Sequence, residues 1–230
     1  MPPLIVAIDG PSGVGKSTTS KLVARSLGIP HIDTGAMYRA IALLAVRAGV
    51  ALDDEPRLEG MAERARIDFA PGPDKPRVLL DGEDVSEQIR TLEMSMAASD
   101  VSKLPGVRRV LVRLQQSLGR RSGGVLEGRD IGTKVFPETS HKFFLTARPE
   151  VRARRRHKEL MESGLSAGSY EGVLEETIRR DGQDSTRADS PLRYDESYQL
   201  IDTSDLTVAQ VVERIVASVR LRQGQSLTPP

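Results

Sequence analysis

Short apolar runs alternate with segments of helical periodicity along much of the chain. The run Leu4–Ile8 precedes a helical pattern at about 16–27, and a short strand at 30–32 precedes a second helix that ends before Gly49. Further strands are expected at 141–146 and 199–202. Alternating strands and helices are typical of a parallel sheet with helices on both faces. The pattern therefore predicts an α/β fold with three layers, α/β/α, around a central parallel sheet.

This alternation is interrupted between about residues 58 and 90. Two short strands, at 66–70 and 77–80, flank a segment rich in proline and glycine at 71–76, and Asp81-Gly82 offers a tight turn into a third strand. Strands separated by such turn residues form β-hairpins. We therefore expect a small antiparallel β-subdomain inserted into the α/β domain, the alternative being a surface loop without a function of its own.

The remaining helices are expected at about 91–102, 106–118, 149–163 and 170–181, followed by a polar segment at 181–187. Gly28 should end the first helix, which carries Leu22, Val23 and Leu27 inward. Thr207 should cap a last helix whose inward residues are Val208, Val211, Val212, Ile215 and Val216. We expect one domain over residues 1–222, with the insertion at about 58–90, an arginine-rich region at about 149–187 and a frayed tail at 223–230.

The stretch Gly10–Ser17 follows the first strand and opens the first helix. It fits the pattern G-x-x-x-x-G-K-[ST] at every fixed position, in the strand–loop–helix context that a phosphate-binding loop requires. Its glycines allow the backbone amides to surround a phosphate, and the helix start adds the positive end of a dipole. Lys16 can reach the β- and γ-phosphates, and the Ser17 hydroxyl can bind the Mg²⁺ that accompanies the nucleotide. The expected contacts with ATP are Gly10, Pro11, Ser12, Gly13, Val14, Gly15, Lys16, Ser17 and Thr18.

Composition excludes several classes of function. The formal net charge is +1 and aromatic residues make up 3% of the chain, which argues against a nucleic-acid-binding surface. Absence of cysteine excludes disulfides and thiol chemistry. We find no signal peptide and no apolar stretch of membrane-spanning length, so we expect a cytoplasmic protein that binds small molecules and neither nucleic acid nor membrane.

Arginines are the side chains that we expect to take part in phosphoryl transfer, because the reaction depends on positioning the phosphates and on neutralising the charge of their oxygens. Arg39 and Arg129 each follow a predicted strand end, at the edge of the sheet where α/β proteins bind ligands. The arginine-rich helix at 149–163 is either a lid that closes over a triphosphate, with Arg155 as its catalytic candidate, or a solvated charged face. Asp130 and Asp184 either pair with neighbouring arginines or accept hydrogen bonds from a substrate amine or hydroxyl.

With these segments identified, the chain resembles bacterial cytidylate kinases, which are nucleoside monophosphate kinases of the P-loop class. The resemblance extends over nearly the whole chain and is far more specific than the phosphate loop alone. The segments that carry it are the phosphate loop with Ile8-Asp9, Asp33–Arg39, Asp81–Val85 with Ile89-Arg90, Glu127–Thr133, and Arg180–Arg187.

The resemblance implies transfer of the γ-phosphoryl group of Mg-ATP to CMP or dCMP. We expect a monomer, and we expect no protein general base, because the attacking phosphate oxygen is already anionic near neutral pH. The resemblance also implies groups that hold the acceptor phosphate, the cytosine edge and the ribose. These are, in that order, Arg39, Arg129 and Arg187; Ser99, Arg108 and Asp130; and Arg180 with Asp184. Thr34 stands where many members of the family have serine and keeps the hydroxyl. The insertion at about 58–90 corresponds to the family's extra β-subdomain.

Other readings of the phosphate loop are less consistent with the rest of the chain. A shikimate kinase would favour a carboxylate two positions after Asp33, where this chain has Gly35. The inserted hairpin and the segment Gly128-Arg129-Asp130 favour a cytidylate kinase over an adenylate kinase. The guanine-binding motif of GTPase switch proteins begins with asparagine, a residue that this chain does not contain. A nucleic-acid-dependent ATPase would be more basic and richer in aromatic residues.

Overall fold

The computed structural model describes residues 3–70, 77–162, 168–187 and 189–224. The chain divides by its internal contacts into two compact units, one formed by Met1–Pro30 with Gly123–Pro230 and the other by His31–Ser122. In sequence, the second unit is one continuous segment that lies between the two segments of the first. None of the helices in the described ranges is long and apolar enough to cross a membrane.

Parallel strands form the centre of the first unit. β1 (Ile5–Asp9) lies between β6 (Gly124–Gly128) and β7 (His141–Thr146), and β8 (Gln199–Asp202) pairs with β7. The register places Asp9 beside Gly128 and Phe144, so β1 and β6 end together while β7 continues two residues further, to Thr146. A parallel sheet buried among helices consists of nearly continuous apolar runs, as in Val6–Ile8 and Phe143–Leu145, all of which are buried.

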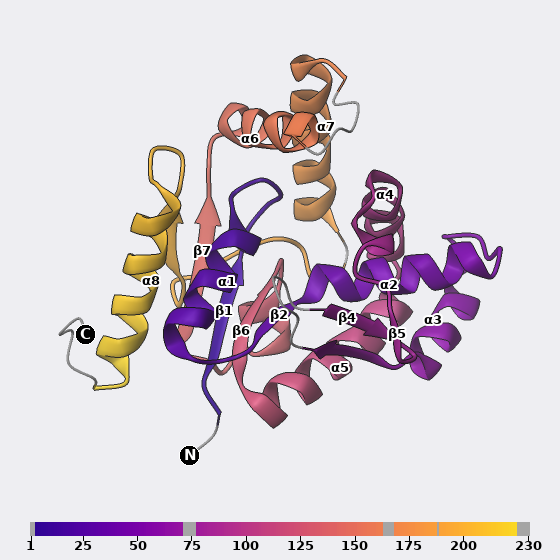
Figure 1. Ribbon diagram of the computed structural model, residues 1–230, viewed down its shortest axis with the longest axis horizontal. Coiled ribbons are helices and arrows are strands. Elements are labelled where there is room, and N and C mark those ends of the chain that lie inside the picture. The colour runs from indigo at the N-terminus through magenta and orange to yellow at the C-terminus, as the bar shows by residue number, and fades with distance from the viewer. Residues whose placement is uncertain (1–2, 71–76, 163–167, 188, 225–230) are drawn as a thin grey trace. The chain divides into compact units, whose positions relative to one another are not determined.

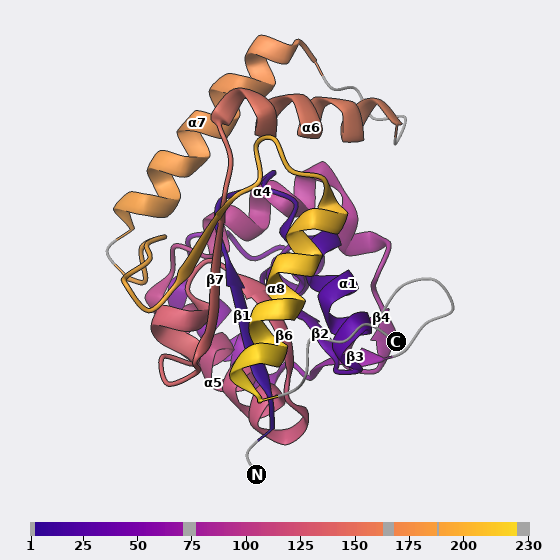
Figure 2. The same cartoon turned by 90° about the vertical axis from the view of Figure 1, so that its left-hand side faces the viewer.

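Two helices pack together on this sheet (Figures 1 and 2). α1 (Lys16–Leu27) ends at Gly28, whose φ of 66° gives the left-handed cap that the sequence predicts. α8 (Val208–Arg222) begins after Thr207, which forms a capping box with Gln210. Their inward side chains join the core around Ile8, Phe143 and Leu145. The predicted parallel sheet with flanking helices is confirmed.

α6 (Pro149–Glu162) and α7 (Tyr170–Thr186) lie together beyond the carboxyl end of β7 (Figures 1 and 2). Residues 163–167 of the predicted arginine-rich region lie outside the described residues. A short π-helical turn, η2 (Ile131–Val135), follows β6 and was not predicted. It redirects the chain immediately after Arg129-Asp130.

The second unit is helical, with a small sheet. Its described residues, 31–70 and 77–122, form β2 (His31–Asp33), the 3-10 turn η1 (Gln88–Arg90) and four helices. β3 (Ile67–Ala70), β4 (Arg77–Leu80) and β5 (Glu83–Asp84) form the predicted antiparallel sheet. The predicted turn at 71–76 lies outside the described residues, as do residues 225–230 of the predicted tail. The helices are α2 (Thr34–Arg47), α3 (Glu55–Arg64), α4 (Leu92–Val101) and α5 (Pro105–Ser122).

Several predictions about helices are wrong. α3 was missed, and Pro105, expected to separate two helices, is the first residue of α5, where its missing N–H costs no hydrogen bond. α7 continues through the polar segment to Thr186. Leu22 and Val208, both expected to point inward, are exposed. On α1 the buried face is instead completed by Thr19 and Ser20, which share the three- and four-residue spacing of Val23 and Ala24.

Candidate active site

The phosphate loop joins β1 to α1 and approaches its neighbours closely. A Cβ on Gly10, where φ is 149°, would lie 2.2 Å from the backbone oxygen of Leu145 on β7. At Gly13, where φ is 78°, a Cβ would lie 3.0 Å from the Cβ of Arg152 on α6. Only glycine satisfies both the backbone conformation and the available space, so these two positions of the motif are fixed by the fold around them.

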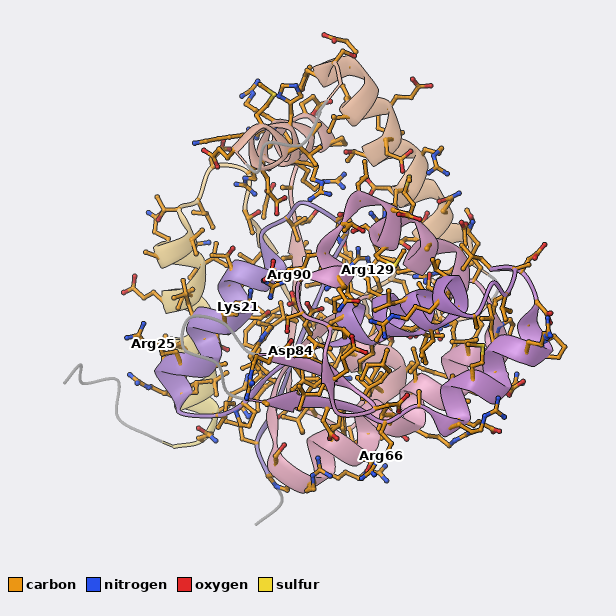
Figure 3. The ribbon with its side chains drawn as sticks, turned by 45° about the vertical axis from the view of Figure 1, so that its right-hand side comes forward. Lys21, Arg25, Arg66, Asp84, Arg90 and Arg129 are labelled. Carbon is orange, nitrogen blue, oxygen red and sulfur yellow. The ribbon has the colours of Figure 1, made fainter. Side chains whose placement is uncertain are left out.

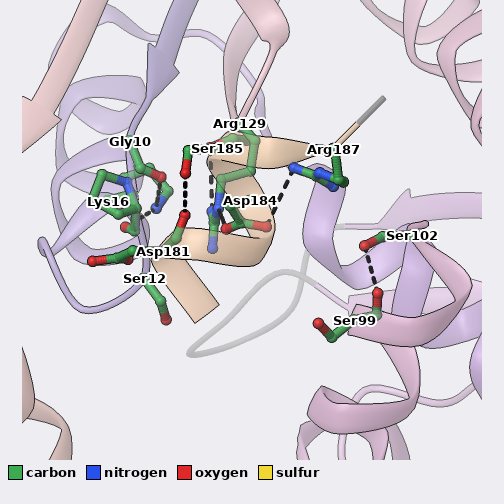
Figure 4. Close-up of polar contacts among 12 residues, drawn as sticks. Gly10, Ser12, Lys16, Ser99, Ser102, Arg129, Asp181, Asp184, Ser185 and Arg187 are labelled. Atoms are coloured by element: carbon green, nitrogen blue, oxygen red, sulfur yellow. Dashed lines mark hydrogen bonds and ion pairs between the residues drawn. The ribbon is translucent and has the colours of Figure 1, made fainter. Parts of the chain in front are cut away.

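Lys16 is buried at the base of this loop (Figure 4). Its ammonium donates hydrogen bonds to the backbone oxygens of Gly10 and Pro11, at 2.7 and 2.6 Å. Burial, together with the neighbouring charge of Arg129, lowers the pKa of Lys16 well below its ordinary value. The loop therefore holds a desolvated cation that an anionic ligand would stabilise.

Ser17 and Thr18 are exposed in the first turn of α1. A hydroxyl there is suited to a metal ion brought by a nucleotide, because Mg²⁺ retains several waters and few protein ligands. No three His, Cys, Asp or Glu side chains lie together as a metal site in the ranges that the structure describes.

An ion cluster stands beside the loop in the same unit (Figure 4). The Arg129 side chain, after β6, donates through Nε to Asp184 Oδ2 at 2.8 Å. Arg187 forms an ion pair with the other oxygen of Asp184, at 3.3 Å. Burial alone would raise the pKa of Asp184, but the charges of Arg129 and Arg187 lower it. We call Arg129, Asp184 and Arg187 the arginine cluster; it carries a net positive charge in a largely buried setting.

Arg180 and Asp130 lie close to this cluster. Burial and the charge of Arg129 lower the pKa of Arg180, one turn before Asp184 on α7. Asp130 is buried directly after Arg129. Basic side chains elsewhere differ: on α1, for example, Arg25 is exposed and points outward, whereas Arg129 lies inside the unit, with 22% of its side chain exposed (Figure 3).

Of the arginines on α6, the sequence did not single out the one with the most contacts. Arg152 is 3% exposed; it donates to the backbone oxygens of Ala147 and Ser12, and it pairs through both terminal nitrogens with Asp181, at 2.8 and 2.5 Å. It therefore connects α7 to the phosphate loop. A run of arginines gives no sign in sequence of which member faces inward.

Arg155, the predicted lid candidate, is held at the end of β8. Its guanidinium donates to the hydroxyl and the backbone oxygen of Thr203, at 3.1 and 2.6 Å. Thr203 in turn donates to the backbone oxygen of Val14 in the phosphate loop, at 3.1 Å. Arg155 thus reaches the loop through Thr203.

The other predicted acceptor residues lie in the second unit. Thr34 begins α2 and is buried, and Arg39 donates to the helix-capping Asp33 at 2.9 Å. Ser99 lies on α4, where its backbone oxygen accepts from the Ser102 hydroxyl at 2.8 Å.

Arg108, on α5, is 2% exposed. It donates to the backbone oxygen of Ser102, and its guanidinium lies 5.7 Å from the centre of the Tyr38 ring. The structure therefore places Arg108 in the same unit as Ser99, and Arg180, Asp184, Arg187 and Arg129 together in the other.

Comparison with known proteins gives consistent results. A family model described as Cytidylate kinase matches residues 6–221. A cytidylate kinase from Caldanaerobacter subterraneus subsp. tengcongensis is 49% identical over 215 residues, which cover 94% of this chain and 94% of that protein. One from Geobacter sp. (strain M21) is 47% identical over 222 residues, with 96% and 95% covered.

A similar fold is found in a crystal structure of an uncharacterized protein from Eubacterium ventriosum. It aligns with a TM-score of 0.55 at 10% identity and covers 95% of this chain and 99% of that chain. At this level of identity the likeness concerns the fold alone.

Proposed function

Because the chain belongs to the cytidylate kinase family, we propose that it transfers the γ-phosphoryl group of ATP to CMP or dCMP, giving ADP with CDP or dCDP. The observation that carries this proposal is that the phosphate loop, with its buried Lys16, and the arginine cluster belong to the same compact unit. A donor-binding loop and a group of arginines suited to a second phosphate thus lie in one compact unit. Two phosphate sites are what a monophosphate kinase requires and a simple ATPase does not.

In this proposal the donor is bound by the phosphate loop. The backbone of Gly10–Gly15 and the start of α1 would surround the phosphates, and Lys16 would neutralise the β- and γ-oxygens. The Ser17 hydroxyl, with Thr18 beside it, would hold the Mg²⁺ of Mg-ATP, which adds positive charge at the phosphates. The buried, desolvated ammonium of Lys16 supports this assignment, since a triphosphate would replace the two backbone oxygens that it now contacts.

The acceptor roles are proposed for each unit by itself. In the first unit, Arg129 and Arg187 bind the acceptor phosphate, and Arg180 with Asp184 bind the ribose; in the second unit, Arg39 is a further proposed phosphate contact. Cytosine has an amine donor at N4 and acceptors at N3 and O2, so a carboxylate and an arginine are complementary to its edge. The buried groups suited to that task are Asp130 and Arg108, with Ser99 and Thr34 supplying hydroxyls.

The reaction needs no protein base. The attacking atom is an oxygen of the acceptor phosphate, already anionic near neutral pH, so alignment with the γ-phosphorus and neutralisation of charge are sufficient. Arg155 is proposed to act on the transferring group by exchanging its contact with Thr203 for a phosphate oxygen, as α6 and α7 close. A monomeric state and a cytoplasmic location stay predictions from the sequence.

The test is a coupled assay of ADP release with CMP, dCMP, UMP, AMP, GMP and shikimate as acceptors. We expect CMP and dCMP to be phosphorylated at least about tenfold faster, as kcat/KM, than AMP, GMP or shikimate, because a hydrogen-bonding site rejects an unmatched base. ATP hydrolysis that is independent of every acceptor would favour a switch-type ATPase, and faster turnover of AMP than of CMP would contradict the proposal.

A further inference from the structure

Asp9 is a fully buried carboxylate, the last residue of β1, directly before the phosphate loop. Its Oδ1 accepts a hydrogen bond from the N–H of Ile131 at 2.9 Å. Its Oδ2 accepts from the N–H of Gly132 at 2.9 Å and from the hydroxyl of Tyr198 at 2.8 Å. Three segments far apart in sequence therefore meet at one side chain.

Ionised Asp9 is costly for the fold. Burial, the first cause, raises its pKa from 3.8 to about 6, and nearby Asp130 adds to the rise, while the hydrogen bonds from Gly132, Ile131 and Tyr198 oppose it. Because the pKa of the folded state exceeds that of the unfolded chain, folding favours the protonated form, and stability at neutral pH is lower than an unshifted carboxyl would give. An uncharged side chain of similar size could fill the same space without this cost in stability.

The two amides that Asp9 holds belong to the segment carrying Arg129. Ile131 and Gly132 are the first residues of η2, directly after Arg129-Asp130. In the sheet, Asp9 lies beside Gly128, the residue before Arg129. The carboxylate thus ties the turn that presents Arg129 to the strand end from which the phosphate loop starts.

Tyr198 fixes Asp9 from the opposite side. Its ring is buried, with its centre 6.1 Å from that of Phe144 in an edge-on contact and 5.8 Å from the ammonium of Lys142. A Cβ on Gly132 would lie 2.6 Å from the Tyr198 hydroxyl, so the tyrosine, Asp9 and the turn are in direct contact. Such supporting contacts hold a functional side chain within the narrow range that catalysis requires.

We propose that Asp9, oriented by Tyr198, is a positioning residue that sets Arg129 against the phosphate loop, so that the acceptor phosphate and the γ-phosphate of ATP are aligned. This rests on the proposed function, in which Arg129 binds the acceptor phosphate. Asp9 itself touches neither nucleotide; it acts through the amides of Ile131 and Gly132.

The first experiment replaces Asp9 by asparagine, which keeps the shape but turns one acceptor into a donor facing a donor. For Asp9→Asn we expect kcat with CMP to fall about tenfold or more, since small misplacements are costly in catalysis. The calorimetric Kd for CMP should weaken, and that for a non-hydrolysable ATP analogue should change by less than about twofold. Tyr198→Phe, which removes one of the hydrogen bonds and keeps the ring, should lower kcat by about two- to threefold.

A double-mutant cycle separates positioning of Arg129 from a general structural role. In an Arg129→Ala background, Asp9→Asn should reduce kcat and CMP affinity by less than about twofold further. An equal reduction in both backgrounds, or an ATP affinity that falls as much as CMP affinity, would overturn the proposal. If Arg129→Ala by itself left CMP binding and turnover unchanged, the proposed role of Arg129 would be wrong instead, so the two failures are distinguishable.

The pH dependence gives a second readout. The charged or titratable groups around Asp9 are Lys16, Arg129, Asp130 and Tyr198. A phosphate monoester such as CMP itself loses a proton near pH 6, so the informative quantity is the ratio of wild-type to Asp9→Asn kcat at each pH. We expect the ratio to be largest above about pH 7 and to approach one as Asp9 becomes protonated below about pH 6. A ratio independent of pH would contradict the proposal.

Thermal unfolding of each variant is followed in parallel. If Asp9→Asn does not fold, the same double-mutant cycle is measured with Tyr198→Phe in place of Asp9→Asn. The effect of Tyr198→Phe on kcat must then disappear in the Arg129→Ala background. A Tyr198→Phe protein with wild-type kcat, or one whose loss persists without Arg129, would overturn the proposal.

Discussion

The phosphate loop and the arginine cluster lie in the same unit but are built in opposite ways. The loop occupies eight consecutive residues, and its buried cation, Lys16, contacts oxygens of Gly10 and Pro11, six and five positions away. In the arginine cluster, Arg129 and Asp184 are 55 positions apart; Arg129 follows β6, and Asp184 lies on α7. The first is a local backbone structure, and the second exists only after the chain has folded.

This difference determines how each region tolerates change. In the proposed function, backbone amides of the loop bind phosphate, so most of its side chains should be dispensable if the conformation survives. Glycine is needed where Gly10 and Gly13 approach other elements. Side chains carry the whole interaction in the cluster, and each arginine depends on the shared carboxylate of Asp184. Removing one member should therefore affect the others.

The largest effect is expected for Lys16→Met, which removes the cation proposed to neutralise the transferring phosphate. We expect kcat to fall by on the order of 10³, because a charge placed on the transition state is lost. The measurement is steady-state turnover with CMP. Lys21→Met, the same change one and a half turns along α1, is the matched control and should stay within about twofold of wild type. A comparable loss of kcat in both variants would mean that the substitutions act by disturbing α1 and not by removing the charge of Lys16.

A somewhat smaller and more selective effect is expected for Arg129→Ala. We expect kcat/KM for CMP to fall by about 10² or more, because the proposed contact with the acceptor phosphate is lost, while the Kd of an ATP analogue changes little. Arg148→Ala is the control, since Arg148 pairs with Asp205 at an exposed position of the same unit. Lost ATP affinity with normal CMP turnover would assign Arg129 to the donor half instead.

The smallest effect is expected at the exposed start of α8, for Thr207→Ala. Loss of the capping box at α8 should lower the free energy of unfolding by about 1 kcal/mol, measured by urea denaturation, and leave both KM values unchanged. Thr207→Ser, which keeps the hydroxyl, should retain most of the stability. A changed KM for either nucleotide would contradict this prediction. It would show that the start of α8 influences nucleotide binding in addition to the phosphate loop and the arginine cluster.

Patterns within a few residues were predicted correctly. The loop motif, the cap at Gly28, the capping residue Thr207 and the small antiparallel sheet depend on backbone conformation and nearest neighbours, which adjacent residues specify. The family assignment rests on several such segments in order and is confirmed by the comparisons. Helix ends were less predictable: α7 runs on to Thr186, and its polar last turns contain Asp181 and Asp184, which pair with Arg152 and Arg129.

The sequence by itself determined the class of protein, the phosphate loop and the residue types needed for a second phosphate, because these are encoded in short, contiguous patterns. Only the tertiary structure decided which arginine of α6 turns inward, that Asp184 is shared by Arg129 and Arg187, and that Asp9 holds the turn after Arg129. The physical reason is that a buried ion pair or hydrogen bond depends on what surrounds both partners. Residues more than a hundred positions apart, such as Asp9 and Gly132, acquire that common surrounding only when the strands pair.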